Sequence, residues 1–298
     1  MNELFIFNVA RNAIKSIIKF ASIYPKPGLI TPLDDSALDG TDYPCLIDGT
    51  MSLFQSFVNF ASAGADTEPM NPRDAFTILK SSIEIGINDS LRATKGKLSL
   101  KGHVFCMGLL AAAAGKLIKQ KRILTPGALT LTAAAFANGI IERELWTLEE
   151  QRGTKIFTQG ERAYIAYGLE GCRGEVEHGY NMTLRACEIL RKLEATQGQL
   201  GFREKCTHAL ISIMAENQDT CLTINEGITG LINVQKEAKK IIDSGGILTV
   251  KGVDEIFNLD KNLRSKGTSP AGSAVIMSCA LFINELANMK LTRSGYDE

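Results

Sequence analysis

The feature of this sequence that most restricts its fold is a hydrophobic period of three to four residues that recurs along the whole chain. Apolar residues at this spacing form one stripe on a helix, whereas a half-buried strand requires strict alternation of apolar and polar residues. No convincing strand alternation occurs in the 298 residues. The pattern predicts an all-α fold: one multi-helix domain over residues 1–298, with a central cleft formed by the loops between helices.

The period predicts helices over the ranges 3–23, 48–63, 73–92, 101–120, 127–142, 158–168, 181–196, 203–216, 223–242, 251–258 and 271–289. Three of them start next to a proline, Pro72, Pro126 or Pro270, where the missing N–H has no helical partner to lose. Asp48 is a candidate N-cap of the second helix. Irregular segments are expected at 24–47, 93–101, 143–157, 169–180, 217–222 and 259–272. Loops on a rigid scaffold carry binding and catalytic residues more often than helices do, so the functional residues are sought there.

The charge balance excludes one class of partner. Lysine plus arginine and aspartate plus glutamate number 33 each, so no net field attracts DNA or RNA. The seven cysteines form no CxxC pair and have no histidine at metal-ligand spacing, which is typical of buried thiols in a reducing compartment. The longest apolar stretch, 105–114, is much shorter than the roughly 20 residues that a bilayer requires. We therefore expect a cytoplasmic protein without a membrane segment.

The first irregular segment holds a lysine between two prolines, Pro25-Lys26-Pro27, followed by Gly28. The prolines fix an extended backbone that could hold the ammonium against a phosphate, although a helix-stop turn with a solvated lysine would have the same sequence. Five carboxylates follow within 34–48, among them Asp42. They could bind magnesium together with substrate phosphates, or form an acidic solvated loop.

Two later segments have similar polar, glycine-bearing composition. Residues 94–102 lead into a helix start at Lys101 and Gly102 that could receive an anion, although they do not match the Walker pattern. Residues 171–180 combine Arg173, Gly174, Glu175 and His178, which suits phosphate binding and acid–base chemistry or a structural Arg–Glu pair. His103 and His208 fall within predicted helices, where packing or surface roles are expected.

The last candidates surround the final helix. Asp219-Thr220 follows one helix, and Ser269, Gly272 and Ser273 precede or begin the last one. Small residues at a helix start allow a phosphate to approach backbone amides closely, but an N-cap with a close helix crossing explains them equally well.

In this order and spacing, the segments resemble the triphosphoribosyl-dephospho-CoA synthases that serve citrate lyase and malonate decarboxylase. The resemblance is carried by Pro25-Lys26-Pro27-Gly28-Leu29, Thr158-Gln159-Gly160-Glu161-Arg162, Gly171-Cys172-Arg173-Gly174-Glu175, Asp219-Thr220 and Ser269-Pro270-Ala271-Gly272-Ser273-Ala274. It implies an all-helical transferase for prosthetic-group biosynthesis. Such an enzyme joins the triphosphoribosyl part of ATP to the ribose hydroxyl of dephospho-CoA, or a related acceptor, and releases adenine.

The resemblance also implies roles for individual residues. Asp42, Glu175 and His178 are the candidates for acid–base catalysis, and Asp42 and Asp219 would bind Mg²⁺. The nucleotide-binding candidates are Lys26, Pro27, Gly28, Lys101, Gly102, Arg173, Gly174, Ser269, Gly272 and Ser273. The expected partners are ATP as substrate and CoA-type small molecules, with an acyl-carrier-protein pathway as context and a homodimer as one assembly.

Several positions depart from the family pattern. Leu38 and Gly40 stand where the family has a histidine and an aspartate, and Leu98-Ser99-Leu100 stands where it has Asn-Thr-His. Asn225 replaces an arginine and Val275 an aspartate. Because aliphatic side chains remove charge and hydrogen bonds, three functions stay open: a transferase of the same class, a nucleotide-binding pseudoenzyme or regulator, and a nucleoside or phosphate hydrolase.

Overall fold

The computed structural model describes residues 3–67 and 70–289, and this part of the chain contains helices and no strand, which confirms the all-α prediction. The α-helices are α1 (Glu3–Ala21), α2 (Tyr43–Ser52), α3 (Phe54–Asp66), α4 (Pro72–Ala93), α5 (Lys101–Lys119), α6 (Pro126–Ala137), α7 (Ile140–Glu144), α8 (Gln159–Tyr167), α9 (Gly171–Glu177), α10 (Asn181–Thr196), α11 (Phe202–Met214), α12 (Gly227–Asp243), α13 (Val250–Ser265) and α14 (Ala271–Ala287). Short 3₁₀ turns are η1 (Glu149–Gln151), η2 (Thr220–Thr223) and η3 (Gly246–Leu248).

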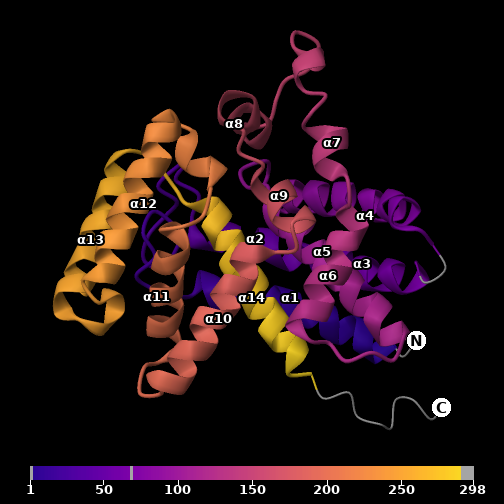
Figure 1. Ribbon diagram of the computed structural model, residues 1–298, viewed down its shortest axis with the longest axis horizontal. Coiled ribbons are helices and arrows are strands. Elements are labelled where there is room, and N and C mark those ends of the chain that lie inside the picture. Colours follow the sequence, from indigo (N-terminus) through magenta and orange to yellow (C-terminus); the bar gives the residue numbers. More distant parts are fainter. Residues whose placement is uncertain (1–2, 68–69, 290–298) are drawn as a thin grey trace.

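Two apolar helices organise the interior. α14 crosses the middle of the molecule, with α10 to α13 on one side and α3 to α7 on the other (Figure 1). α5 packs against α3, α4, α6 and α14, and its residues from Cys106 to Gly115 are all buried. Among the described residues it is the one helix long and apolar enough to cross a membrane, but 72% of that stretch is buried inside the protein. Its composition is therefore explained by its place in the core.

Glycines allow α3 and α5 to approach closely. A Cβ on Gly64 would lie 2.0 Å from the carbonyl oxygen of Ala112, and one on Gly115 would lie 1.9 Å from that of Ala61. Real side chains cannot occupy these positions, so the two backbones are in direct contact. This contact fixes α5, whose first turn contributes to the site described below.

Four sequence predictions about helix boundaries are wrong. The helix predicted over 251–258 continues as α13 to Ser265, into a segment predicted to be irregular. The helix predicted over 48–63 is two helices separated at Leu53, and α2 begins at Tyr43 because the Asp42 carboxylate accepts a hydrogen bond from the Cys45 N–H. Asp48, the predicted N-cap, lies inside α2. The helix predicted over 127–142 ends at Ala137, since Gly139 adopts a left-handed conformation with φ of 74°.

The fourth error concerns residues 169–180, predicted to be irregular, which contain helix α9. Glycine disfavours a helix by about 1 kcal/mol per residue, so local propensity argues against this helix. Its burial supplies the stabilisation: Val176 is fully buried and α9 packs on α5 and α6. At its C-terminal end, the Glu177 carboxylate accepts hydrogen bonds from the N–H groups of Gly139 and Ile141 and so holds the start of α7.

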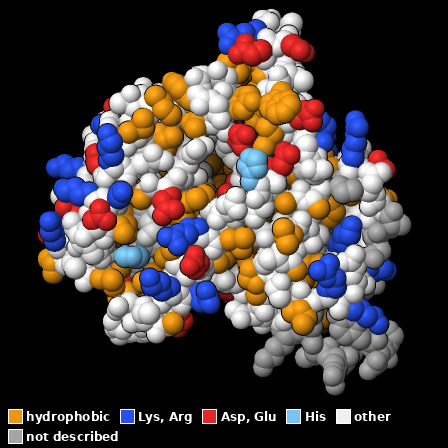
Figure 2. All heavy atoms as spheres, viewed as in Figure 1, with side chains coloured by type: hydrophobic (Ala, Val, Ile, Leu, Met, Phe, Trp, Pro, Cys, Tyr) orange, Lys and Arg blue, Asp and Glu red, His pale blue; other side chains and the backbone are white. Residues whose placement is uncertain are grey.

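Residues 145–158 project from the rest of the molecule between α7 and α8 (Figure 1). Within this projecting segment, Trp146 is 63% and Ile156 94% exposed. On the face shown in Figure 2, positive and negative side chains are interspersed rather than separated into patches, in agreement with the balanced composition.

Candidate active site

A pocket of about 690 Å³ lies where the end of α1, the starts of α5 and α14, and helices α4 and α9 meet. Five of the segments selected from the sequence contribute to its lining. Each contributes at least one residue, and examples in chain order are Lys26, Lys101, Arg173, Thr220 and Ser269. Other predicted residues line it too, namely Gly102 and Gly272. The described structure therefore brings these distant segments to one place.

Lys26 is held at the C-terminal end of α1. Its Nζ donates to the carbonyl oxygens of Phe20 at 2.8 Å and Ala21 at 3.0 Å and lies 4.7 Å from the centre of the Phe20 ring. Its side chain is almost fully buried, and this burial lowers the pKa of Lys26 to about 7. An anion bound beside this ammonium would favour its protonated form.

Pro27 and Gly28 do not line the pocket. The Gly28 N–H donates to Asp260 Oδ1 at 2.8 Å, and a Cβ on Gly28 would lie 2.7 Å from the Thr268 carbonyl oxygen. These contacts of Gly28 hold the segment after α1 against α13 and the loop that precedes α14. They therefore help to fix the position of Lys26, two residues earlier.

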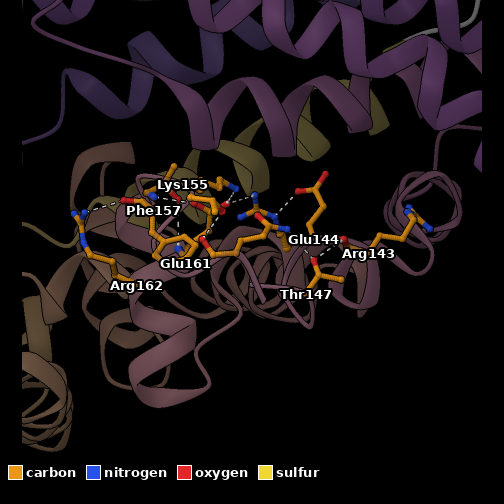
Figure 3. Close-up of polar contacts among 11 residues, drawn as sticks. Arg143, Glu144, Thr147, Lys155, Phe157, Glu161 and Arg162 are labelled. Carbon is orange, nitrogen blue, oxygen red and sulfur yellow. Dashed lines mark hydrogen bonds and ion pairs between the residues drawn. The ribbon is translucent and has the colours of Figure 1, made fainter. Parts of the chain in front are cut away.

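Arg173 lies in the first turn of α9 and joins a network of charges at the pocket. Its Nε donates to Glu144 Oε2 at 2.8 Å, and its Nη2 is 3.9 Å from Glu161 Oε1. Glu161 also binds Lys155 at 2.7 Å (Figure 3) and forms a capping box with Thr158. Burial alone would raise the pKa of Glu161, but the hydrogen bonds from Lys155 and Thr158 outweigh it and lower the pKa. Within the described residues, Nη1 of Arg173 has no partner, so it is the donor available to a bound anion.

Asp219 occupies the N-terminus of α14, where the sequence predicted a phosphate. Its Oδ1 accepts from the Gly272 N–H at 3.1 Å and its Oδ2 from the Ser273 N–H at 2.7 Å and the Ser273 hydroxyl at 2.9 Å. Burial raises the pKa of Asp219, while these hydrogen bonds act in the opposite direction. The amides predicted to receive a ligand are thus used by the protein's own carboxylate.

Glu175 and His178 lie outside the pocket lining. The Glu175 carboxylate accepts hydrogen bonds from the N–H groups of Met182 and Thr183 and from the Thr183 hydroxyl, so it caps α10. Burial raises its pKa, against the effect of these bonds. His178 is exposed and its Nε2 lies 2.8 Å from Glu170 Oε2. Gly174 is buried. A Cβ at this position would lie 2.5 Å from a carboxylate oxygen of Glu170.

The predicted magnesium ligands do not fit a metal site. Asp42 is exposed, caps α2 and is not part of the pocket lining, while both oxygens of Asp219 are engaged at α14. Within the described ranges, no group of three or more His, Cys, Asp or Glu side chains is arranged to hold a metal ion. The carboxylates that do line the pocket are Asp39, Glu84, Glu144 and Glu170.

The aliphatic departures from the family pattern are gathered in this same pocket. Leu38, Leu98, Leu100 and Val275 all line it, together with apolar side chains of α1 and α4 such as Phe20 and Ile83. Asn225 lies outside the lining, where its amide donates to the carbonyl oxygens of Lys266 and Gly267. The lining is consequently apolar over much of its surface, with charged groups at separate points.

His103 is one of several polar lining residues that were not selected from the sequence, where packing or surface roles were expected for it. It lines the pocket from the first turn of α5, with its Nε2 3.2 Å from the Ser278 hydroxyl on α14. Burial and the nearby Lys26 lower the pKa of His103 to about 4. The sequence feature that could have identified His103 as a site residue is its position two residues after Lys101, in the first turn of a predicted helix.

Comparisons with known proteins agree with the resemblance seen in the sequence. The family model described as ATP:dephospho-CoA triphosphoribosyl transferase matches residues 6–293. A 2-(5''-triphosphoribosyl)-3'-dephosphocoenzyme-A synthase of Klebsiella pneumoniae is 29% identical over 272 residues, which cover 91% of this chain and 88% of that protein. No solved structure matches the chain. Because the family model extends over nearly the whole sequence, the chain belongs to the ATP:dephospho-CoA triphosphoribosyl transferase family.

Proposed function

We propose that this protein transfers the triphosphoribosyl group of ATP to dephospho-CoA, or to a closely related acceptor, and releases adenine. The observation that carries the proposal is the family match over residues 6–293, which includes every segment that lines the pocket. The reaction forms a bond between the acceptor hydroxyl oxygen and the ribose anomeric carbon. It breaks the bond from that carbon to adenine, and the hydroxyl proton is balanced by the proton that adenine gains.

The charges of the pocket suit a triphosphate. Lys26, Lys97, Lys101 and Arg173 are the cations that line it near the starts of α5 and α9. Charge-assisted hydrogen bonds of this kind are about twice as strong as neutral ones, and an arginine Nη1 without another partner is well suited to a phosphate oxygen. The apolar wall formed by α1 and α4 would receive the less polar parts of the two substrates, which are the adenine ring and the pantetheine arm.

A positively charged, oxocarbenium-like transition state requires a nearby carboxylate. Since Asp42 and Glu175 are engaged as helix caps outside the lining, we assign this role to the lining carboxylates, of which Glu170 lies next to Arg173 in the same turn. Mg²⁺ would supply charge neutralisation of the triphosphate in such a site. The predicted ligand pair, Asp42 and Asp219, does not fit such a site.

The direct test is incubation with ATP, magnesium and dephospho-CoA, followed by chromatography for free adenine and mass spectrometry for the triphosphoribosylated product. Arg173→Gln should lower the rate by a factor of ten or more, since it removes the phosphate donor. Arg185→Gln, on the exposed surface of α10, is the matched control. ATP binding without adenine release would favour the pseudoenzyme, and phosphate release without adenine would favour a hydrolase.

The wider context belongs to the same proposal. We place the reaction in the cytoplasm and its product in a pathway that loads an acyl carrier protein, and we propose a homodimer as the working assembly. Light scattering coupled to size-exclusion chromatography tests the assembly. A mass of one chain at micromolar concentration would exclude the homodimer.

A further inference from the structure

We propose that His103 is the catalytic base that takes the proton from the acceptor hydroxyl. The inference rests on the proposed function and adds to it a residue that neither the sequence motifs nor the comparisons select. It follows from the position of the ring, from the hydrogen bond that orients it, and from the atom that this bond leaves open.

The ring lies among the groups that would bind the substrates. His103 is in the first turn of α5, two residues after Lys101, and both line the pocket. Gly102, between them, keeps this turn against α14, because a Cβ there would lie 2.8 Å from a Val275 methyl group. The first turn of α5 therefore packs closely against α14 at the pocket.

A chain of two hydrogen bonds fixes which ring nitrogen carries the proton. The Ser278 hydroxyl donates to the Ala274 carbonyl oxygen at 2.9 Å, within α14. Its single proton is used there, so its oxygen must accept from His103 Nε2–H, 3.2 Å away. This assigns the neutral Nε2–H tautomer and leaves a lone pair on Nδ1.

Nδ1 of His103 has no hydrogen-bond partner in the described part of the chain. It is also not among the buried polar atoms that lack a partner, so it remains accessible. His208 differs in this respect, since its Nδ1 is buried without a partner and the residue does not line the pocket. His178 does not line the pocket either, and it is paired with Glu170. Of the three histidines, His103 alone presents an unprotonated nitrogen to a ligand in this pocket.

The surroundings keep the ring unprotonated before the reaction. Burial and the positive charge of Lys26 lower the pKa of His103 to about 4, so the ring is neutral at physiological pH. The same effects make it a weak base, so it takes the proton only as the hydroxyl becomes more acidic on bonding to the anomeric carbon. The acceptor hydroxyl would donate to Nδ1 as its oxygen bonds to the anomeric carbon. The proton then leaves the imidazolium for solvent as adenine takes up one proton, and the ring returns to its neutral form.

The experiment compares single-turnover rates at saturating ATP and dephospho-CoA for wild type, His103→Gln and His208→Gln. Glutamine at 103 keeps a donor for Ser278 and removes the base, so its rate of adenine release should fall about 100-fold or more. Its dissociation constants for both substrates should stay within about threefold of the wild-type values. His208→Gln, outside the pocket, should keep the wild-type rate.

Two further measurements separate catalysis from structure. Added imidazole should restore part of the rate of His103→Ala and none of the rate of Arg173→Gln. Ser278→Ala should lower the rate with little change in affinity, and ¹⁵N NMR of the ring should show the loss of the Nε2–H tautomer preference.

Different negative results would refute the role of His103 and the proposed function. If wild type releases adenine and His103→Gln does so at the same rate, the role of His103 is refuted and the proposed function stands. If folded wild type binds ATP but releases no adenine with any acceptor, both proposals fall together. A rate loss in His103→Gln matched by an equal loss of ATP affinity would also overturn the assignment, because it indicates binding rather than proton transfer.

Discussion

At the scale of single residues, three carboxylates near the site accept hydrogen bonds from helix N-termini. Asp219 accepts from the first turn of α14, Glu175 from α10, and Glu177 from the start of α7. The free N–H groups of a helix start and its dipole both favour a negative charge. Motifs that suggest catalysis in the sequence thus contribute to the architecture around the pocket.

Glu175 makes stability depend on pH with a defined sign. Its pKa is raised in the folded protein above the ordinary 4.5, so between these two values the folded state binds a proton that the unfolded state has lost. The free energy of unfolding should therefore fall as pH rises from 4.5 through the raised pKa. Urea denaturation at several pH values should show this slope in wild type and a smaller slope in Glu175→Gln, in which Asp219 still titrates. Equal slopes would contradict the predicted contribution of Glu175.

Lys26 should couple ATP affinity to pH. Its pKa of about 7 means that its charge increases as pH falls from 8 to 6, so ATP should bind more tightly at the lower pH. Lys26→Met should weaken ATP binding roughly tenfold or more at pH 6, as expected for loss of a hydrogen bond to a charged group, and should lose this part of the pH dependence. Titration calorimetry measures both effects. Lys19→Met, on the partly exposed side of α1 where Lys19 pairs with Glu285, is the control and should leave both unchanged.

At the scale of elements, the α3–α5 contact determines where the pocket residues of α5 lie. Gly115→Ala would place a methyl group 1.9 Å from the Ala61 carbonyl oxygen, and only a shift of a backbone could relieve the overlap. We expect a loss of about 1–3 kcal/mol or more in the free energy of unfolding by urea denaturation. Gly127→Ala in α6, where a Cβ would meet nothing within 4 Å, should instead stabilise the protein by roughly 0.5–1 kcal/mol. Similar values for the two variants would exclude a tight contact at Gly115.

At the scale of the whole molecule, ligand binding should protect segments that are far apart in the sequence. Hydrogen exchange with and without ATP should show slower exchange together at 17–30, 97–105, 158–173, 219–224 and 269–278, because these ranges contribute to one pocket. Peptides of α12 and α13, which do not line it, serve as internal controls. Protection confined to one of the five ranges would show that they do not bind a common ligand.

The sequence predicted the helices that follow from local hydrophobic periodicity. It did not predict features that depend on contacts between residues far apart in the chain. Helices such as α10 were predicted to the residue, whereas α9 was missed because its stability comes from the burial of Val176 against other helices. Five of the segments that meet at the pocket were identified by composition, whereas α4 was not. The sequence did not predict where each side chain points. The packing of α10 and α14 directs Glu175 and Asp219 to helix starts and leaves His103 at the pocket.

The projecting segment has a practical consequence. Trp146 is the single tryptophan of the chain, it is 63% exposed, and it lies two residues after Glu144, which lines the pocket and binds Arg173. All indole emission of the protein therefore arises from one site, two residues along the chain from a residue that lines the pocket. We expect intrinsic fluorescence and its quenching by iodide to change when a ligand at Arg173 alters the contact with Glu144, without any chemical modification of the chain.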